Sequence, residues 1–567
     1  MPTTKPTNER FDSRIEDIVN VQKALTEIDI SQCMNIGFNV EKAGAPMLCV
    51  DGKAYVDAED SHTIIFGSTG SKKTRVMIMP TVRMLALANE TMIIVDPKAE
   101  LYDRTAADLQ DRGYEIYAIN FRDPSYGNAW NPLYIPYMFY RSGARDRAYE
   151  FVNDIVTNIV KDSISTKEPF WDLSAADLLF GFILILFDRC ANNKPKDFYR
   201  NSANPSDELF SDEDVNISEV IKLRNRLFKD NYLENSSYWR GEKEKASLIS
   251  ASMMGTMTAP SEKTQSSILC TFDQKMRIFL LQDNLTQMLS TNDISFDSFG
   301  ESGKKQVVYI IMPDEKTTYH KLISLFIKQS YEYFIYKAQM LSTRSHSTRI
   351  NYLLDEFASL PAINDFPAMI AAARSRNIRF NIVIQSQSQL KKKYEEDAET
   401  IKANCNNWIF LTSRELTLLN ELDELCGRLN ESNRVFSKSR MQHFEKARNH
   451  SEALLLCGRL YPFLTRLDDI NIYDGYDDAH SSRNLPMQFR ETKVEQTYID
   501  DLFEEDRVEE SLDAEPSKKD ENDVHPYDVQ KELERKFDEL FGAFEDEQEE
   551  KKEEKTDKTP AKKQRKK

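Results

Sequence analysis

Cysteine is scarce in this chain, and its few cysteines are scattered. There are seven in 567 residues, an odd number, and no two are spaced as Cys-x-x-Cys. Zinc sites, thiol redox motifs and disulfide frameworks depend on closely spaced pairs. The pattern argues against metal or redox work by these thiols. It predicts buried, reduced side chains at Cys33, Cys49, Cys190, Cys270, Cys405, Cys426 and Cys457.

The chain also lacks a long apolar run. A membrane-spanning helix needs about 20 consecutive apolar residues, and the most apolar stretch, LLFGFILILF at residues 178–187, has roughly half that length. The N-terminal MPTTKPTNERFDSR has no apolar core after its charges, which distinguishes it from a secretory signal. We therefore predict a cytoplasmic protein in which residues 178–187 belong to a buried helix.

Positive charge is in deficit. The chain has 75 Lys and Arg against 93 Asp and Glu, a formal net charge of -18. This argues against a protein that coats nucleic acid through general basicity, but it is compatible with a local basic channel. From residue 501 onward, acidic residues outnumber basic ones by about nine, so roughly half of the deficit belongs to the tail.

Strand-like apolar runs alternate with helical patterns in two separate parts of the chain. Residues 61–139 contain TIIF, MIIVD and YEIYAIN, and residues 301–480 contain QVVYIIMPD, RINYLLDEF, IRFNIVIQS and NWIFLTS. Such alternation is typical of a parallel sheet with helices on its faces. Residues 140–300 show mainly helical patterns. The predicted fold is therefore α/β, with one nucleotide-binding domain interrupted by an all-α insertion domain.

The two ends of the chain differ from this body. Residues 1–60 predict an amphipathic helix and a β-hairpin, MLCVDGKAYVD, that turns at Asp51-Gly52. Residues 481–567 predict an acidic, largely disordered tail. Within it, residues 528–547 predict an amphipathic helix that docks in a partner's groove, or else a fluctuating, solubilising segment. Its apolar stripe consists of Val529, Leu533, Phe537, Leu540, Phe541 and Phe544.

The stretch GSTGSKKTR at residues 67–75 follows a strand-like run and precedes a helix-like one. A phosphate loop, G-x-x-x-x-G-K-[ST], occupies that place: its backbone N–H groups cradle phosphate, its Lys reaches the β/γ oxygens and its Thr holds Mg²⁺. Lys72 stands where the second glycine is expected. A chance match or a dead loop is the alternative to an ATP and Mg²⁺ site formed by Gly67, Ser68, Thr69, Gly70, Ser71, Lys72, Lys73 and Thr74.

A second motif supports the first. The apolar run ending Leu353-Leu354 is followed by Asp355 and Glu356. A phosphate loop needs one carboxylate at the end of a neighbouring strand for Mg²⁺, and often a second to orient the attacking water. We assign Thr74 and Asp355 to the metal and Glu356 to general-base catalysis. An ordinary acidic pair after a strand is the alternative.

Several further stretches resemble one family, the type IV coupling proteins, which are hexameric ATPases that bring DNA or protein cargo to conjugative secretion channels. In chain order they are GSTGSKKT, IIVDPKAELY, INFRDPSYGNAWNPL, EPFWDLSAADLL, VVYIIMPD, LLDEFASLPAI, AAARSRNIRFNIVIQSQSQLKKKY and LLLCGRLYPF. The resemblance implies a RecA-type P-loop NTPase domain with an inserted all-α domain, and assembly into a homo-hexamer.

The resemblance also implies roles for four residues. Asp96 and Lys98 of the segment DPKAE are expected near the nucleotide, unless the segment is a plain exit from a strand. Arg374, favoured over Arg376, is expected to act as an arginine finger on a neighbouring subunit, unless it is a solvated helix charge. Gln385 resembles the family's nucleotide-sensing glutamine, its alternative being an ordinary hydrogen-bonding group at a strand end.

Three functions agree with these observations. The first is a coupling ATPase that recruits relaxase-bound single-stranded DNA, or protein cargo, to a type IV secretion channel and drives its transfer during conjugation. The second is a docking adaptor of the same system that has lost turnover through Lys72. The third is another ring-shaped DNA motor or helicase. Expected partners are single-stranded DNA, a relaxase or accessory protein, and channel subunits.

Two departures from the family pattern bear on this prediction. The family's N-terminal membrane helices are not found, so we expect docking on a separate membrane anchor or the channel, at the inner face of the cell membrane. Lys72 replaces a loop glycine. We expect its backbone in a region open to non-glycine residues and its stem pointing to solvent or a neighbouring subunit. Its ammonium should add a second positive charge near the γ-phosphate.

Overall fold

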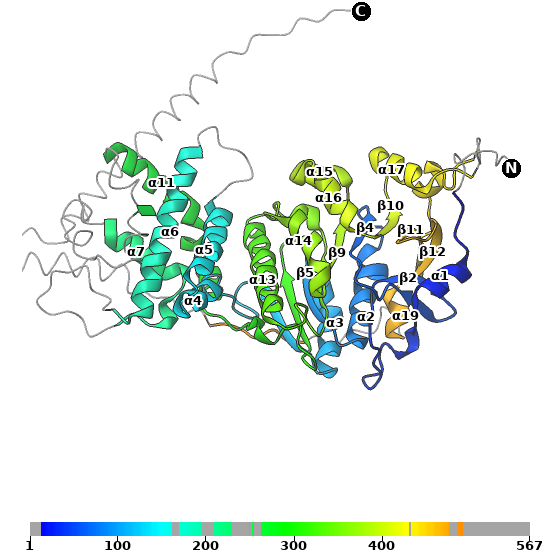
Figure 1. The fold of residues 1–567 in the computed structure, drawn as a ribbon, viewed down its shortest axis with the longest axis horizontal. Helices are drawn as coiled ribbons and strands as arrows, with labels where there is room; N and C mark the ends of the chain where they lie inside the picture. Colours follow the sequence, from blue (N-terminus) through cyan, green and yellow to red (C-terminus); the bar gives the residue numbers. More distant parts are fainter. Residues whose placement is uncertain are drawn as a thin grey trace, which may run out of the picture. The chain divides into compact units, whose positions relative to one another are not determined.

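A mixed sheet of nine strands forms the centre of the computed structural model, which describes residues 13–160, 169–194, 209–228, 249, 252–253, 262–429, 433–475 and 485–491 (Figure 1). The strand order is β12-β11-β10-β4-β9-β8-β5-β7-β6. The parallel strands are β4 (Thr63–Gly67), β5 (Thr91–Asp96), β6 (Glu115–Asn120), β7 (Gln306–Ile311), β8 (Ile350–Leu354), β9 (Ile378–Ile384) and β10 (Asn407–Thr412). An antiparallel hairpin, β11 (His450–Cys457) and β12 (Phe463–Asp468), extends the sheet at β10. The predicted α/β fold class is confirmed.

The central strands are apolar on both faces because helices cover both. Every residue of β5 and of β9 is buried, as expected for parallel strands enclosed between two layers. Successive residues of β5 alternate between two cores: Ile93 and Val95 face one, while Met92 and Ile94 face the other.

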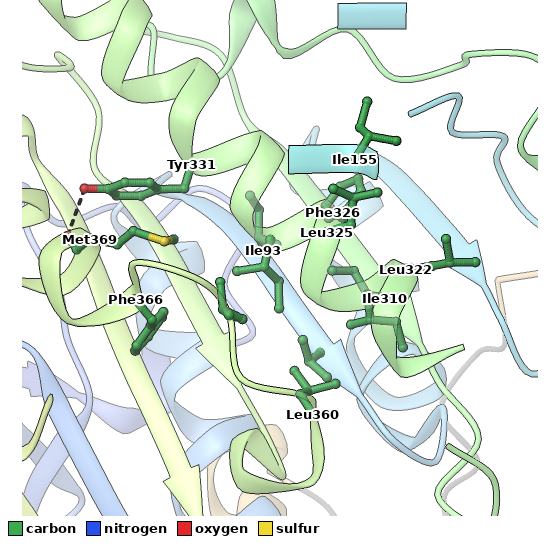
Figure 2. Packing of buried hydrophobic residues seen from close by; sticks show 14 of the residues in the cluster. Ile93, Ile155, Ile310, Leu322, Leu325, Phe326, Tyr331, Leu360, Phe366 and Met369 are labelled. Carbon is green, nitrogen blue, oxygen red and sulfur yellow. Dashed lines mark hydrogen bonds between the residues drawn. The ribbon is translucent and has the colours of Figure 1, made fainter. Parts of the chain in front are cut away.

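Helices from distant parts of the chain form the two layers. One face carries α2 (Met79–Leu87), α3 (Glu100–Asp111) and α19 (Ile470–Asp474). The other face carries α13 (His320–Met340), α14 (Phe366–Ala373), α15 (Gln387–Tyr394), α16 (Asp397–Asn404) and α17 (Leu416–Cys426), and α18 (Lys438–Gln442) follows in the chain. Figure 2 shows Ile93 and Ile310 of the sheet facing Leu325 and Phe326 of α13. The Tyr331 hydroxyl donates to the carbonyl of Met369, 2.8 Å away, and so joins α13 to α14.

In the part of the chain that the structure describes, six α-helices lie between β6 and β7, where the sequence predicts an all-α domain. They are α4 (Tyr134–Arg141), α5 (Arg145–Val160), α6 (Pro169–Ala191), α7 (Ile217–Phe228), α11 (Glu262–Leu280) and α12 (Asp283–Met288). Helix α6 packs against α5, α7 and α11. Helix α5 also packs against α13, where Lys328 and Asp154 form an ion pair of 2.7 Å. The helical segment is thus joined to the sheet layers through α13.

Helix α6 corrects one prediction from the sequence. Within the described ranges it is the one helix long and apolar enough to cross a membrane by length and composition, with a mean hydropathy of 1.9 over its most apolar window. The apolar stretch at residues 178–187 continues as helix in both directions, which the sequence reading missed. Because 67% of that window is buried inside the fold, α6 is weak evidence for a membrane span. The buried helix expected at residues 178–187 is observed.

A small second sheet precedes the large one. Its strands are β1 (Thr26–Asp29), β2 (Pro46–Val50) and β3 (Lys53–Val56), in the order β1-β3-β2, after helix α1 (Ile18–Ala24). Strands β2 and β3 turn at Asp51-Gly52, both with positive φ, which suits a tight hairpin turn. Strand β2 contacts β12 of the large sheet. The tail helix predicted at residues 528–547 lies outside the described residues.

The cysteines follow the prediction with one exception. All seven are free, six are buried, and Cys270 is exposed on α11. Burial raises the pKa of the Cys33 thiol and of the Cys49 thiol to about 12, so both stay protonated at neutral pH.

We predict that Gly44→Ala destabilises the fold, because a methyl group at Gly44 would lie 1.9 Å from the carbonyl oxygen of Asp57. Such overpacking typically costs about 1–3 kcal/mol, and the thermal unfolding midpoint should fall by several degrees. Gly37→Ala is the matched control, since its nearest neighbour is the side-chain oxygen of Asn35, 3.6 Å away. Equal midpoints for the two variants would contradict the packing at Gly44.

Candidate active site

The loop GSTGSKKTR lies at the carboxyl edge of the sheet, between β4 and the helix that follows it. Gly67 ends β4, and a Cβ there would lie 2.5 Å from Ser71 Oγ, so the turn favours the smallest residue. Gly70 has a φ of +78°. The helix opens with a π-helical turn, Thr74–Ile78, an irregularity that is frequent at functional sites.

Lys72 departs from what the sequence analysis expects. Its φ is +65°, in the left-handed region that glycine adopts freely and that costs other residues about 1–2 kcal/mol. Its ammonium donates to the carbonyl oxygens of Ala447 and Arg448, at 2.9 and 2.7 Å, and lies 3.5 Å from Asp469 Oδ2. The expected backbone region is therefore wrong. The side chain leaves the loop, but toward the β11–β12 hairpin of its own chain, and its ammonium is bound there.

Lys73 is the buried centre of a chain of polar contacts. Its ammonium lies 3.1 Å from Glu356 Oε1. The Gln385 amide nitrogen donates to both Glu356 oxygens at 2.6 Å, and the Thr69 hydroxyl donates to Gln385 Oε1 at 3.1 Å. These contacts join the loop to the residues that follow β8 and end β9. Glu356 has a φ of +54°, a strained conformation for a non-glycine residue and one that recurs at functional sites.

Asp355 lies beside Thr74. The Thr74 hydroxyl is 3.4 Å from Asp355 Oδ2, and Asp355 Oδ1 accepts the backbone N–H of Glu356 at 2.9 Å. Burial raises the pKa of Asp355 to about 7, while Lys73 opposes that shift. A hydroxyl and a carboxylate fit Mg²⁺, which takes few protein oxygens together with water and substrate phosphate. Among the described residues, no three His, Cys, Asp or Glu side chains group as a metal cage would require.

A cavity of about 520 Å³ opens in front of these groups. It is lined from four loops, which follow β4, β5, β7 and β8, and from the end of β9 with the start of α15. The predicted site residues that line it are Thr69, Gly70, Ser71, Lys72, Lys73, Thr74, Lys98, Asp355, Glu356 and Gln385. The remaining walls are formed by Arg75, Pro97, Glu100, Met312, Asp314, Ser359 and Gln389.

Asp96 and Lys98 are both expected near the nucleotide, but of the two Lys98 alone lines the cavity. Asp96 is fully buried and does not line the cavity. It accepts the backbone N–H groups of Tyr102 at 2.9 Å and Lys98 at 3.4 Å, and so holds the start of α3. Burial raises the pKa of Asp96 to about 7. Glu100 of the same DPKAE segment also lines the cavity, as the segment's expected position near the nucleotide implies. Sequence reasoning missed Asp314, which ends VVYIIMPD.

Arg374 lies away from the cavity of its own chain. It begins the short helical turn Arg374–Arg376, directly before β9, and is exposed. That position is the amino edge of the sheet, whereas the cavity lies at the carboxyl edge. One chain therefore does not bring Arg374 together with Glu356.

Two residues that contact the loop, Asp469 and Lys446, were not found by sequence reasoning. Asp469 binds Arg75, with oxygen to nitrogen distances of 2.6 and 3.0 Å. Lys446 donates to the carbonyl oxygen of Gly70. No signal in the sequence points to these contacts, because each partner lies more than 370 residues from the loop.

The comparisons with known proteins bear on the family and the fold of this chain. Residues 14–456 match the family described as type IV secretory system conjugative DNA transfer. The bacterial conjugative coupling protein TrwBdeltaN70 in its unbound monoclinic form is 15% identical, with a TM-score of 0.51 over 85% of this chain and 98% of that chain. Its trigonal form in complex with sulphate is 14% identical, with a TM-score of 0.50 over 86% and 98%.

A further solved structure, plasmid coupling protein TrwB in complex with ADP and Mg²⁺, is 14% identical, with a TM-score of 0.49 over 82% of this chain and 96% of that chain. Among curated proteins, none matches. Identities this low show a shared fold. The strand-helix order of this chain is therefore the fold of these coupling proteins.

Proposed function

This chain belongs to the type IV secretory system conjugative DNA transfer family, and from this we propose that it is the coupling ATPase of a conjugative system. It recruits relaxase-bound single-stranded DNA, or protein cargo, to a type IV secretion channel and drives transfer by hydrolysing ATP. The observation that carries the proposal is the polar chain Thr69–Gln385–Glu356–Lys73, which joins the phosphate loop to two neighbouring strand ends.

The loop and its neighbours bind the nucleotide. Backbone N–H groups of residues 67–74 surround the β-phosphate at the start of the helix, where negative charge is favoured. Lys73 exchanges its Glu356 partner for phosphate oxygens, so its buried charge is paired before and after binding. Thr74 and Asp355 would hold Mg²⁺, which would supply positive charge beside the phosphates. Lys98 adds a positive side chain from the loop that follows β5.

Hydrolysis depends on Glu356. Once Lys73 has turned to the phosphates, the Glu356 carboxylate is held by Gln385 alone and can accept the proton of the attacking water. Gln385 thereby senses the nucleotide, because it binds both Thr69 of the phosphate loop and the proposed general base Glu356. Arg374 completes the site of a neighbouring subunit in a homo-hexamer, which suits its exposure and its distance from its own cavity.

The helical segment between β6 and β7 selects cargo, and the sheet layers drive its movement. The predicted boundaries at residues 61–139, 140–300 and 301–480 describe this division of labour. Docking on a channel subunit or a separate membrane anchor places the hexamer at the inner face of the cell membrane. These assignments rest on membership of the family.

The second candidate is a docking adaptor that binds nucleotide without turnover. The left-handed backbone of Lys72 favours the adaptor, since strain at this residue would distort the loop that has to fit the phosphates. The complete set of Lys73, Thr74, Asp355 and Glu356 favours the ATPase. ATP hydrolysis stimulated by single-stranded DNA separates the two, because the adaptor would show none. Unwinding of duplex DNA without any channel subunit would indicate a helicase instead.

We predict that Lys73→Ala weakens binding of a fluorescent ADP analogue with Mg²⁺ by roughly 100-fold, because the charge-assisted bonds to the phosphates are lost. Lys391→Ala is the matched control, since Lys391 is exposed on α15 and does not line the cavity. Equal affinity of Lys73→Ala and the parent would mean that the loop is not a nucleotide site.

We predict that Glu356→Gln keeps nucleotide binding and lowers the rate of phosphate release by roughly 10²–10⁴-fold, because the amide cannot accept a proton from water. Asp355 remains available for Mg²⁺ in this variant. Stopped-flow phosphate release and equilibrium binding of the same nucleotide analogue measure the two effects. Turnover at the parent's rate would remove Glu356 from the mechanism.

We predict that Arg374→Ala lowers turnover by about tenfold or more while monomers bind nucleotide as the parent does, because its charge acts across the subunit interface. Mixing it with Glu356→Gln subunits should restore part of the activity, since each variant supplies what the other lacks. Arg376→Ala is the comparison, and loss of activity in that variant alone would assign the finger to Arg376. No recovery on mixing would contradict a finger acting in trans.

A further inference from the structure

The buried carboxylate of Asp469, which lies directly after the edge strand β12, supports the phosphate loop. Asp469 directly follows β12 and caps α19, accepting the N–H of Asn471 at 3.2 Å. Its side chain has no exposed surface. Arg75 binds both carboxylate oxygens, Nη2 to Oδ1 at 2.6 Å and Nε to Oδ2 at 3.0 Å. The Lys72 ammonium lies 3.5 Å from Oδ2.

The two cations bracket the residues that contact phosphate and metal. Lys72 directly precedes Lys73, and Arg75 directly follows Thr74. Asp469 therefore restrains the chain on both sides of Lys73-Thr74. A carboxylate without exposed surface needs such partners, because an unpaired buried charge is strongly unfavourable.

The same hairpin holds the loop at further points. The Lys72 ammonium also binds the carbonyl oxygens of Ala447 and Arg448, which precede β11, and Lys446 binds the carbonyl of Gly70. Lys72 keeps the left-handed backbone that a glycine would supply, and it adds a side chain that joins the loop to the hairpin. A glycine at this position would give the same turn without that restraint.

We infer that Asp469 is a positioning residue of the phosphate loop, acting through Lys72 and Arg75 to keep Lys73 and Thr74 in place. Lys72 stands where a phosphate loop has its second glycine, and its side chain is part of this support. The β11–β12 hairpin is accordingly a structural component of the nucleotide site. This inference rests on the proposed nucleotide-binding function and names the residues that sustain it.

The chain provides a matched control five residues away. Asp474 lies on the same helix α19 and likewise has no exposed side-chain surface. It pairs with Arg83 of α2 at 2.9 Å and with Arg104 of α3 at 2.8 Å. Neither arginine belongs to the phosphate loop. Asp469→Asn and Asp474→Asn thus remove comparable buried charges, and only the first acts on the loop.

The test compares the parent with both variants. We expect both substitutions to lower the thermal unfolding midpoint. Only Asp469→Asn should weaken binding of the fluorescent ADP analogue with Mg²⁺, by about tenfold, and raise KM for ATP by a similar factor with kcat within about twofold. Equal affinities for Asp469→Asn and the parent, or equal losses in the two variants, would overturn the inference.

Lys72→Met alone keeps the inference testable if Asp469→Asn folds poorly, and where Asp469→Asn folds, combining the two variants shows whether they act on one restraint. Lys72→Met removes one anchor while leaving Asp469 bound to Arg75. It should weaken the same nucleotide by a few-fold, and its effect should be smaller in the Asp469→Asn background, since both act on one restraint. Full additivity would show that Asp469 does not act through Lys72.

Hydrogen exchange separates this inference from the proposed function. Backbone amides of residues 68–76 should exchange faster in nucleotide-free Asp469→Asn than in Asp474→Asn or the parent, because the loop has lost its anchor. If the parent binds no nucleotide and this difference is found, the proposed function fails while the positioning role stands. If the parent binds nucleotide and the exchange is equal, the positioning role fails alone.

Discussion

The candidate site depends on the parallel pairing of β4, β8 and β9. Strand β9 pairs with β4 on one side and with β8 on the other, so the three strands end at the same edge of the sheet. Thr69 and Gln385 contact each other there although 316 residues separate them in the chain. The same pairing brings Glu356 to 3.1 Å from Lys73. Antiparallel pairing at either position would have sent one of these groups to the opposite edge.

Burial strengthens these polar contacts, because little water competes for the charged groups. The Lys73 side chain is 8% exposed, and burial raises the pKa of Asp355 to about 7. Lys73, Glu356 and Gln385 each have a partner in the protein, which offsets the cost of burying them. In the proposed function, a phosphate group competes with Glu356 for Lys73. Exchange of partners at this lysine then connects nucleotide binding with the position of Glu356, the proposed general base.

The edge hairpin β11–β12 does more than lengthen the sheet. Two buried carboxylates on the short helix that follows it, Asp469 and Asp474, bind cations of the phosphate loop and of α2 and α3 respectively. Helix α19 therefore joins the hairpin to the phosphate loop and to helices α2 and α3. A segment near residue 470 thus holds a loop near residue 70 in place.

The sequence by itself determined the α/β alternation, the phosphate loop and its acidic partner strand. These features are local: apolar strand patterns, a strand-turn-helix around residues 67–75, and Asp355-Glu356 at the end of an apolar run. The direction of Lys72, the support from Asp469, the burial of Asp96 and the remoteness of Arg374 were decided by the tertiary structure alone. Lys72 and Asp469 are 397 residues apart, and no spacing rule connects them. Sequence patterns report which face of an element is apolar, whereas the partner of a polar side chain depends on which strands become neighbours, and that depends on the packing of the entire sheet.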